Sequence, residues 1–449
     1  MKGASGLVPP ANDDREQDLL RASADFGHIV DSHPLGVLTA RSVGAVQELV
    51  AFAGPRGIAV TARGGGQALY GQGQADGGYV VDMAGLNDVR CVPEDRVLVA
   101  GAGALWSDVV RAALAAGLAP PVVPDHLGGS VGGVLSTGGF GGASHRFGLV
   151  ADWVRELEVV TGAGERLVCS QQVYPDLFRA VLAGLGQCAL IVRATLQLLP
   201  APARVRRYRL YHRTPGTFFT DQRRLARDAR FSHVAGQARP ALDGGWHYMI
   251  EAVAPHDGQL QPEDGLFIGD LDHDPDTEEI EDLSYAEYLH RLDRDERLLR
   301  ATGEWHRPHP WLTLLLPEEA ATSFVPAVLA EDAQQALRFC GTVQLRPLTG
   351  STLHAPLLRR PPGERLCLLS LMRTAPPDRP DVVRRLVAAN RAIHTRATAV
   401  GGVLHPGGAL PMTPDDWRTH FGPDWDELVR AKALYDTHRV LTRGYGLWP

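Results

Sequence analysis

The sequence predicts an α+β fold divided into two domains, and three observations lead to that expectation. Its 449 residues exceed what one hydrophobic core usually serves. Short strand-like and helix-like runs alternate through the first two hundred residues. After Pro200-Ala201-Pro202 the pattern of predicted elements changes, and longer helix-like runs separated by extended runs continue to about residue 400. We therefore expect domains at 1–203 and 204–400, with a compact, aromatic-rich segment at 401–449 that folds back on them.

The N-terminal domain is predicted to consist of short elements that follow a loose tail from Met1 to Asp14. A strand at 36–38 precedes Ser42, a residue type suited to the N-cap of a helix over 43–54. Pro55-Arg56-Gly57 predicts a turn before a strand at 58–62. The further elements expected are strands over 79–83 and 96–100, a helix over 106–116, a hairpin of 156–161 and 166–169, a helix over 177–182 and a strand over 189–199.

The second domain is expected to contain helices over 218–228, 285–301 and 382–399. Between the first two lies an acidic stretch, Asp270 to Asp282. Its carboxylates lack the glycine-centred register of a calcium-binding loop. We therefore expect a solvated loop there, and no metal site.

Composition excludes several classes of partner. The net charge is −7 and the apolar fraction 44%, which argues against nucleic acid or an anionic membrane as a main partner. The five cysteines are scattered, without metal-ligand or redox spacing, as is usual in a reducing compartment. No signal-peptide run occupies the first 25 residues, and no stretch approaches 18 apolar residues. We expect a cytoplasmic monomer or homodimer.

The most informative segment is the glycine loop, which we define as residues 63–68 (Arg63-Gly64-Gly65-Gly66-Gln67-Ala68). Three glycines directly follow a strand-like run, so the backbone there can adopt positive φ and approach a ligand closely. Successive bare N–H groups in such a loop form a nest for an anion such as a pyrophosphate. By itself, a triple glycine is more often a surface turn.

A second glycine-rich segment runs from Leu127 to Gly142 and has eight glycines in sixteen residues. Buriable side chains such as Val131, Leu135 and Phe140 interrupt it, which distinguishes it from a low-complexity linker. The pattern indicates backbone packed closely around something flat or phosphorylated.

Taken in order, these motifs resemble the flavoproteins of the vanillyl-alcohol oxidase / p-cresol methylhydroxylase (PCMH) superfamily, and within it the cytokinin dehydrogenases. The resemblance covers roughly residues 35 to 445. It is carried by the glycine loop, Asp125-His126-Leu127, Ser130 to Ser136, His145-Arg146-Phe147-Gly148, Asp176-Leu177-Phe178, Gly184 to Gln187, Leu190-Ile191, Trp305, Pro308 to Leu312, His420-Phe421-Gly422, Trp425, Lys432 and Tyr435-Asp436.

The resemblance implies a two-domain PCMH-type fold that binds FAD. Residues 1–203 would form the FAD-binding domain, completed by 401–449, and 204–400 an inserted substrate domain with an antiparallel sheet and helices. Loop amides would hold the pyrophosphate, with the Ser130 and Ser136 hydroxyls as further donors. The residues implied to bind FAD are Arg63, Gly64, Gly65, Gly66, Gln67, Ala68, Gln72, Asp125, Ser130, Gly132, Gly133, Ser136, Phe140, Leu190, Ile191, His405, Thr442 and Tyr445.

Gln67 departs from the family pattern at the position where a histidine commonly bonds covalently to the flavin. Ala68 follows where serine is usual. Histidine is absent from positions 34 to 125, so no neighbouring residue can make the bond instead. We therefore predict non-covalent FAD, with a lower reduction potential.

Asp125 corresponds to the aspartate that takes a proton from the substrate amine, and we favour this catalytic role over that of a turn or cap residue. The second family carboxylate has no clear counterpart, although Glu278, Glu279 and Glu281 lie nearby in sequence.

The implied substrate-binding residues are Trp311 and Thr313, the latter where asparagine is usual. His405 stands where a flavin-side tyrosine is expected, and either replaces it or is an ordinary loop histidine. Thr442-Arg443-Gly444-Tyr445 replaces the family's Ser-Pro-Gly-Gln. These changes indicate a substrate pocket outside the cytokinin pattern.

Three functions follow from these observations. The first is an FAD-dependent oxidase or dehydrogenase that takes hydride from a C–H next to an alcohol or amine of a small, largely apolar molecule, in a biosynthetic tailoring step or as a cytokinin dehydrogenase proper. It would pass electrons to O2 or another acceptor. The alternatives are a redox-neutral cyclase or lyase with FAD as scaffold, and a binding protein with an inactive flavin site.

Overall fold

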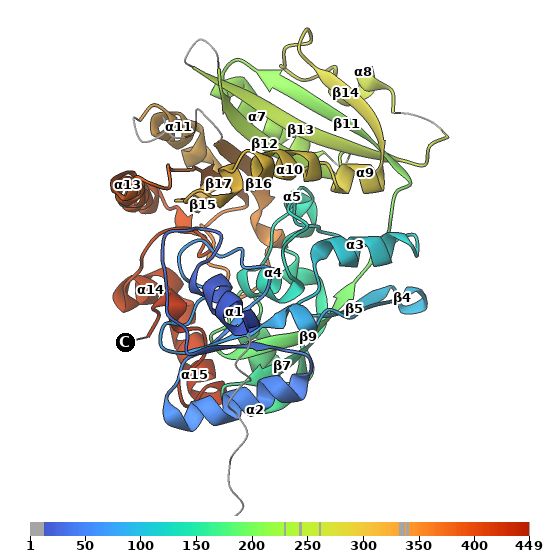
Figure 1. Cartoon of the computed structure of the whole chain (residues 1–449). Coiled ribbons are helices and arrows are strands. Elements are labelled where there is room, and N and C mark those ends of the chain that lie inside the picture. Colours follow the sequence, from blue (N-terminus) through green and yellow to red (C-terminus); the bar gives the residue numbers. More distant parts are fainter. Residues whose placement is uncertain are drawn as a thin grey trace, which may run out of the picture.

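The computed structural model describes residues 13–228, 230–241, 245–259, 262–331, 337 and 341–448. The chain forms two stacked bodies (Figure 1). The lower body comprises residues 13–200 together with the C-terminal helices α14 (Pro414–Phe421) and α15 (Trp425–Tyr435). The upper body comprises residues 204–404 and is built on one large sheet. The architecture is the mixed α+β, two-part arrangement that the sequence predicts.

The lower body begins with α1 (Asp13–Ser23) and a parallel three-stranded sheet in the order β1-β3-β2. Its strands are β1 (Gly36–Thr39), β2 (Val60–Arg63) and β3 (Tyr79–Asp82). Between β1 and β2 lies α2 (Val43–Ala53), capped by the Ser42 hydroxyl, which accepts the Ala45 N–H. The predicted tail, Met1 to Asp14, lies outside the described residues apart from Asp13 and Asp14, where α1 begins.

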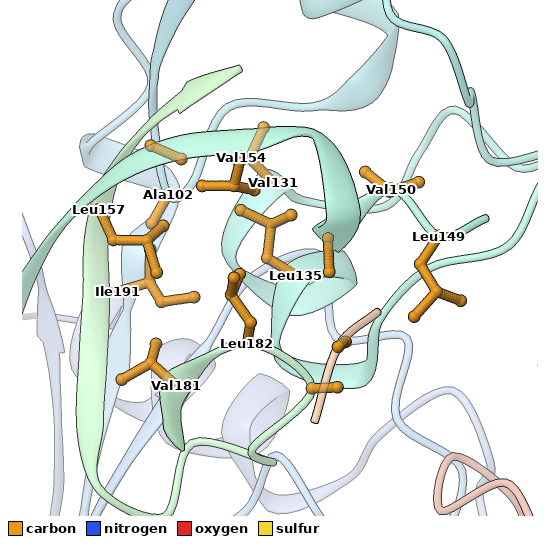
Figure 2. Packing of buried hydrophobic residues seen from close by; sticks show 14 of the residues in the cluster. Ala102, Val131, Leu135, Leu149, Val150, Val154, Leu157, Val181, Leu182 and Ile191 are labelled. Atoms are coloured by element: carbon orange, nitrogen blue, oxygen red, sulfur yellow. The ribbon is translucent and has the colours of Figure 1, made fainter. Parts of the chain in front are cut away.

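A five-stranded antiparallel sheet, in the order β4-β5-β9-β7-β8, forms the rest of this body. Figure 2 shows Val131 and Leu135 of α4 packing toward Val154, Leu157 and Ile191 of the sheet. The elements are β4 (Val89–Val92), β5 (Val97–Gly101), α3 (Trp106–Leu114), β6 (Leu118–Ala119), α4 (Val131–Thr137), α5 (Ser144–Phe147), β7 (Val154–Thr161), β8 (Arg166–Ser170), α6 (Pro175–Val181), β9 (Ala189–Gln197) and β10 (Leu199–Pro200).

The upper sheet has eight antiparallel strands in the order β14-β11-β13-β12-β16-β17-β15-β18. These are β11 (Arg204–His212), β12 (His233–Pro240), β13 (Trp246–His256), β14 (Glu279–Ser284), β15 (Leu312–Pro317), β16 (Thr342–Thr349), β17 (Arg365–Met372) and β18 (Val403–Leu404).

Strand alternation divides the upper sheet between two cores. Leu314 and Leu316 pack in the core of the upper body, under α7 (Pro215–Arg227), α11 (Glu318–Leu329) and α13 (Pro380–Ala399). Leu315 packs instead in the core of the lower body. One face of the sheet is therefore covered by helices, and the other lies against the lower body (Figure 1).

Two sequence-based expectations in this body are wrong. The acidic stretch is not all loop, because Glu279–Ser284 forms the edge strand β14, where carboxylates pair with arginines of β11. The helix expected over 285–301 is two helices, α9 (Tyr285–Leu289) and α10 (Asp293–Ala301). A short helix α8 (Asp264–Ile268) precedes them, and single 3₁₀ turns occur at Gly54–Arg56, Met83–Gly85, Pro93–Asp95, Ala151–Trp153, Glu304–His306, Gly350–Thr352, Gly422–Asp424 and Arg443–Tyr445.

Within the described residues, no helix is both long and apolar enough to cross a bilayer. The same residues contain no group of three or more histidine, cysteine or acidic side chains arranged to hold a metal ion. Cys91, Cys169, Cys188 and Cys367 are free thiols, and Cys340 lies outside the described residues.

Candidate functional site

A cavity of about 290 Å³ opens in the lower body where four chain segments meet: the glycine loop, the start of α4, the entry to β9, and the C-terminal turn at 442–445. The residues from the predicted FAD set that line it are Arg63, Gly64, Gly65, Gly66, Gln67, Ala68, Gln72, Ser130, Gly132, Gly133, Ser136, Leu190, Ile191, Thr442 and Tyr445. Asp125, Phe140 and His405 are not part of its lining.

The glycine loop needs its glycines because the Ser130 side chain and the Gly128 backbone lie against it. A Cβ on Gly64 would stand 1.8 Å from the Ser130 hydroxyl oxygen, and one on Gly65 would stand 2.8 Å from the Gly128 carbonyl oxygen. Gly66 has φ +70°, in the left-handed region that favours glycine. The loop therefore presents bare backbone at its part of the cavity wall, as in a nest that binds a pyrophosphate.

Gln72 fixes the far end of the loop. Its side-chain oxygen accepts the N–H groups of Leu69 and Tyr70 at 3.1 and 2.7 Å, and its amide nitrogen donates to the Gly408 carbonyl at 3.1 Å. The Gln67 side-chain amide donates to the Gly65 carbonyl at 3.4 Å, and Gln67 lines the cavity.

A segment that sequence reasoning missed, Phe26-Gly27, supports the loop from the other side. Their N–H groups donate to the carbonyls of Gly66 and Ala68 at 2.9 and 3.0 Å. His309 of the upper body donates its own N–H to Gly27 at 2.8 Å. The loop is thereby connected to the upper body, although no local motif marks Phe26 in the sequence.

At the start of α4, the Ser130 hydroxyl oxygen accepts the Gly133 N–H at 3.3 Å as the helix N-cap. The Ser136 hydroxyl donates to the Gly132 carbonyl at 2.8 Å. Ser136 would have to give up this bond to donate to a ligand, whereas the Ser130 hydroxyl acts as acceptor and can also donate.

Phe140 and His405 lie behind the cavity rather than on its wall. Their rings meet edge to face at 5.4 Å, and His405 Nε2 donates to the carbonyl of Thr137, a lining residue, at 3.0 Å. Burial lowers the pKa of His405, so its imidazole is neutral. Gly407 lines the cavity in its neighbourhood.

The C-terminal turn closes the cavity opposite the loop. Thr442 donates its N–H to Val60 at 2.9 Å and its hydroxyl to the Gly186 carbonyl at 3.0 Å. Tyr445 lines the cavity, and burial raises the pKa of its phenol. Beneath the turn, the buried Lys432 ammonium joins the Asp436 carboxylate at 2.7 Å and the Gln187 carbonyl at 2.7 Å.

Asp125 lies five residues before Ser130, with its side chain 18% exposed. Oδ1 accepts from Arg291 Nη2 at 2.8 Å, and Oδ2 accepts from Arg346 Nη2. Burial opposes the carboxylate charge, but the two guanidinium groups hold the pKa of Asp125 well below its usual range. Asp125 is therefore ionised and a weak base.

Sequence reasoning did not find the three charged residues around Asp125, which are Arg291, Arg346 and Glu251. Arg291 also binds Glu251 Oε1 through Nε at 3.0 Å, and Glu251 Oε2 accepts from Arg207 at 2.7 Å. Glu251 and Arg346 each interrupt an apolar strand, and that interruption was the available signal. Glu279 and Glu281, considered earlier for the second carboxylate, pair instead with arginines on β11.

Glu278, the remaining candidate for that carboxylate, pairs with His273 at 2.8 Å. Among the described carboxylates, Glu251 is the one that shares an arginine with Asp125.

Trp311 and Thr313 belong to the upper body and do not line the cavity. Trp311 sits edge-on to Phe26 and His309, with ring centroids 5.4 and 5.5 Å apart. The Thr313 hydroxyl bonds Ser370 at 2.9 Å, and its carbonyl accepts the His405 N–H at 3.0 Å. Trp311 reaches the cavity wall through Phe26, which bonds Gly66. Thr313 reaches it through His405, which bonds Thr137.

The residues present fit FAD. Four segments converge on one cavity, a glycine loop leaves backbone amides at its wall, and a side chain on Gly64 or Gly65 would fill that wall. Asp125 precedes, by five residues, the segment that begins at Ser130 and lines the cavity.

Comparison with known proteins agrees with this geometry. Residues 34–170 match the family described as FAD binding domain, and residues 216–448 match that described as cytokinin dehydrogenase 1, FAD and cytokinin binding. The chain is 38% identical to an uncharacterized oxidoreductase, ORF5 in the fasciation locus, of Rhodococcoides fascians, over 95% of this chain and 96% of that protein.

Plant relatives are nearly as similar. The chain is 34% identical to cytokinin dehydrogenase 10 of Oryza sativa subsp. japonica, over 96% of this chain and 87% of that protein. It is 30% identical to cytokinin dehydrogenase 2 of Arabidopsis thaliana, over 95% of this chain and 91% of that protein.

Proposed function

The chain belongs to the cytokinin dehydrogenase family of FAD-dependent oxidoreductases, and from that premise we propose that it removes hydride from a C–H bond next to the nitrogen of a small, largely apolar amine. FAD, when bound, supplies the hydride acceptor, and O2 or another acceptor takes the electrons. The observation that supports the amine most directly is the pair of guanidinium groups, from Arg291 and Arg346, that bind the Asp125 carboxylate.

A carboxylate with a depressed pKa accepts a hydrogen bond well but keeps a proton poorly. Loss of hydride beside nitrogen leaves a cation stabilised by the nitrogen lone pair, and a fixed anion nearby stabilises that cation further. Loss of hydride beside a hydroxyl requires simultaneous removal of the hydroxyl proton, for which Asp125 is a weak base. An amine therefore suits this site better than an alcohol.

We further propose that FAD is held without a covalent bond. Gln67 lines the cavity at the position expected for the flavin-linked histidine, and an amide nitrogen is not a nucleophile toward the flavin methyl group. The glycine loop, the Ser130 hydroxyl and the C-terminal turn would hold the cofactor through hydrogen bonds and packing.

Aromatic side chains support an apolar substrate. Phe26, Trp305, His309 and Trp311 form a cluster at the junction of the two bodies, in which Phe26 stacks on His309 at 4.0 Å. Cytokinins, the class named in the plant relatives, belong among the candidate amines. Thr313 in place of asparagine favours testing other secondary amines beside them.

The test is anaerobic stopped-flow reduction of the holoenzyme's flavin with an amine and with the alcohol of the same carbon skeleton. We expect the amine to bleach the flavin and the alcohol to do so far more slowly. Asp125→Asn, which removes this fixed anion, should slow reduction by roughly 10²- to 10³-fold. Asp264→Asn, which removes a carboxylate bonded to Arg206 outside the network around Asp125, is the matched control.

A wild-type rate in Asp125→Asn would refute the role of this carboxylate, and faster reduction by the alcohol would refute the choice of an amine. Turnover without bleaching would show instead the redox-neutral alternative.

A further inference from the structure

The carboxylate proposed to face the substrate comes from the lower body, whereas the groups that bind it come from the upper body. Asp125 follows Pro124, which pairs with Gly141. Arg346 lies on β16, opposite Leu368 of β17, and Arg291 lies just after α9. One guanidinium binds each carboxylate oxygen, across the boundary between the bodies.

The two arginines differ in their other partners. Arg291 also binds Glu251 and covers the ring of Tyr288 at 4.4 Å, so it belongs to a wider network. Arg346 is 5% exposed, and among the described residues Asp125 is the one acidic group that it binds. Its Nε and Nη1 atoms are buried and have no partner among these residues. The charge of Arg346 therefore bears on Asp125 more than on the rest of the network.

We propose that Arg346, supported by Arg291, is a positioning residue that keeps Asp125 ionised and fixes the direction of its carboxylate toward the substrate. The proposal rests on the proposed function of Asp125. It assigns to the upper body the control of a carboxylate that the FAD-binding part of the chain supplies.

The titratable groups around Asp125 allow the effect of Arg346 on its charge to be measured. The charged and titratable groups that face Asp125 are Arg291, Arg346, Glu251, His145, His233 and Tyr288. Burial lowers the pKa of His145 to about 4 and that of His233 to about 3. Glu251 has a pKa below its usual range because of Arg291 and Arg207, which outweigh its burial, and burial raises that of Tyr288.

These shifts move the titration of His145, His233, Glu251 and Tyr288 out of the range from pH 5 to pH 9. Loss of the Arg346 charge would raise the pKa of Asp125, since burial then acts against one guanidinium instead of two. A loss of flavin-reduction rate toward low pH within that range would therefore indicate protonation of Asp125.

The experiment compares flavin reduction from pH 5 to pH 9 in the wild-type holoenzyme and in Arg346→Gln, Arg346→Lys and Arg206→Gln. For Arg346→Gln, the rate relative to wild type should fall as the pH is lowered from 8 to 5. Arg346→Lys keeps the positive charge. Its flavin-reduction rate should depend on pH as in wild type, with a lower maximal rate. Arg206→Gln removes an arginine of β11 that pairs with Asp264 and should leave the profile unchanged.

A second measurement does not depend on activity. Urea unfolding of wild type, Asp125→Asn, Arg346→Gln and the double variant at pH 7 gives the coupling between the two side chains. We expect a coupling of at least about tenfold in the unfolding equilibrium constant. This also separates a variant that folds poorly from one that titrates differently.

A pH profile of Arg346→Gln that superimposes on wild type, or a coupling near unity, would overturn the proposal. If Asp125→Asn reduces flavin at the wild-type rate, the proposed function itself fails, whatever the coupling. The two failures are therefore distinguishable.

Discussion

Replacing Gly64 by alanine should weaken both FAD binding and the fold, because the new methyl group would meet the cap of α4. Its Cβ would lie 1.8 Å from the Ser130 hydroxyl oxygen and 2.6 Å from the Ser130 Cβ. Either the Ser130 side chain or the glycine loop must move. Both line the cavity, so either movement changes the wall that we expect to hold the pyrophosphate.

The size of the effect follows from these contacts. Forcing a methyl group into a packed site costs about 1–3 kcal/mol. Displacing the Ser130 hydroxyl from the Gly133 N–H removes an N-cap worth about 1 kcal/mol. We therefore expect Gly64→Ala to lower the free energy of unfolding by about 2–4 kcal/mol, and to raise the FAD dissociation constant by at least about tenfold.

The assays are urea unfolding of the apoprotein and titration of apoprotein with FAD, followed by quenching of flavin fluorescence. Gly44→Ala is the matched control, because its nearest atom is 3.8 Å away and it lies within α2, where alanine is favoured over glycine by up to about 1 kcal/mol.

The double variant Gly64→Ala/Ser130→Gly removes the atoms that clash while keeping a tolerated cap residue. It should recover most of the lost stability. Unchanged stability and FAD affinity in Gly64→Ala, or no recovery in the double variant, would refute the assignment of the loop's glycines to contact with residues 128–130.

Three other changes test separate parts of the molecule. Acid precipitation of the holoenzyme should release all flavin to the supernatant, since Gln67 cannot bond to it; a yellow pellet would contradict this. Lys432→Met should lower the free energy of unfolding in urea by about 3–5 kcal/mol, because it leaves the buried Asp436 carboxylate without its cation; a loss below about 1 kcal/mol would argue against the pair. Burial raises the pKa of Asp25 to about 6, so its contribution to stability should be full below pH 3.8 and lost as pH rises to about 6. Urea unfolding of wild type against Asp25→Asn at pH 4 to 7 measures this difference, and parallel curves would contradict it.

The parts of the site that the sequence predicted are those encoded by local backbone requirements. Consecutive glycines permit backbone conformations that other residues rarely adopt, and Ser42 and Ser130 each precede a helix whose free N–H groups they satisfy. Such signals depend on a few neighbouring residues. The resemblance carried by the ordered motifs implied the FAD-binding set, and that set lines the cavity apart from Asp125, Phe140 and His405. Other lining residues, such as Met83 and Ala102, were not predicted.

What the sequence could not give are the partners of each charged side chain. Arg346 meets Asp125 across 221 positions of sequence, and no local pattern encodes that pairing. The residues of β14 were expected to lie in a solvated loop, because a run of acidic residues without the register of a calcium site usually does. Paired with Arg204, Arg207 and Arg209 of β11, they become cross-strand ion pairs.

The same limit bears on how the chemistry of Asp125 should be understood. The motif around this residue specifies a carboxylate near a flavin, but the motif does not specify whether that carboxylate takes a proton or remains an anion. That property depends on the residues at positions 291 and 346, which come from the other body. A chain with the same motif and a neutral residue in place of Arg346 would present a stronger base, better suited to an alcohol. We therefore infer that the choice between amine and alcohol is made in the substrate-binding part of the chain, by the charge that it places against Asp125.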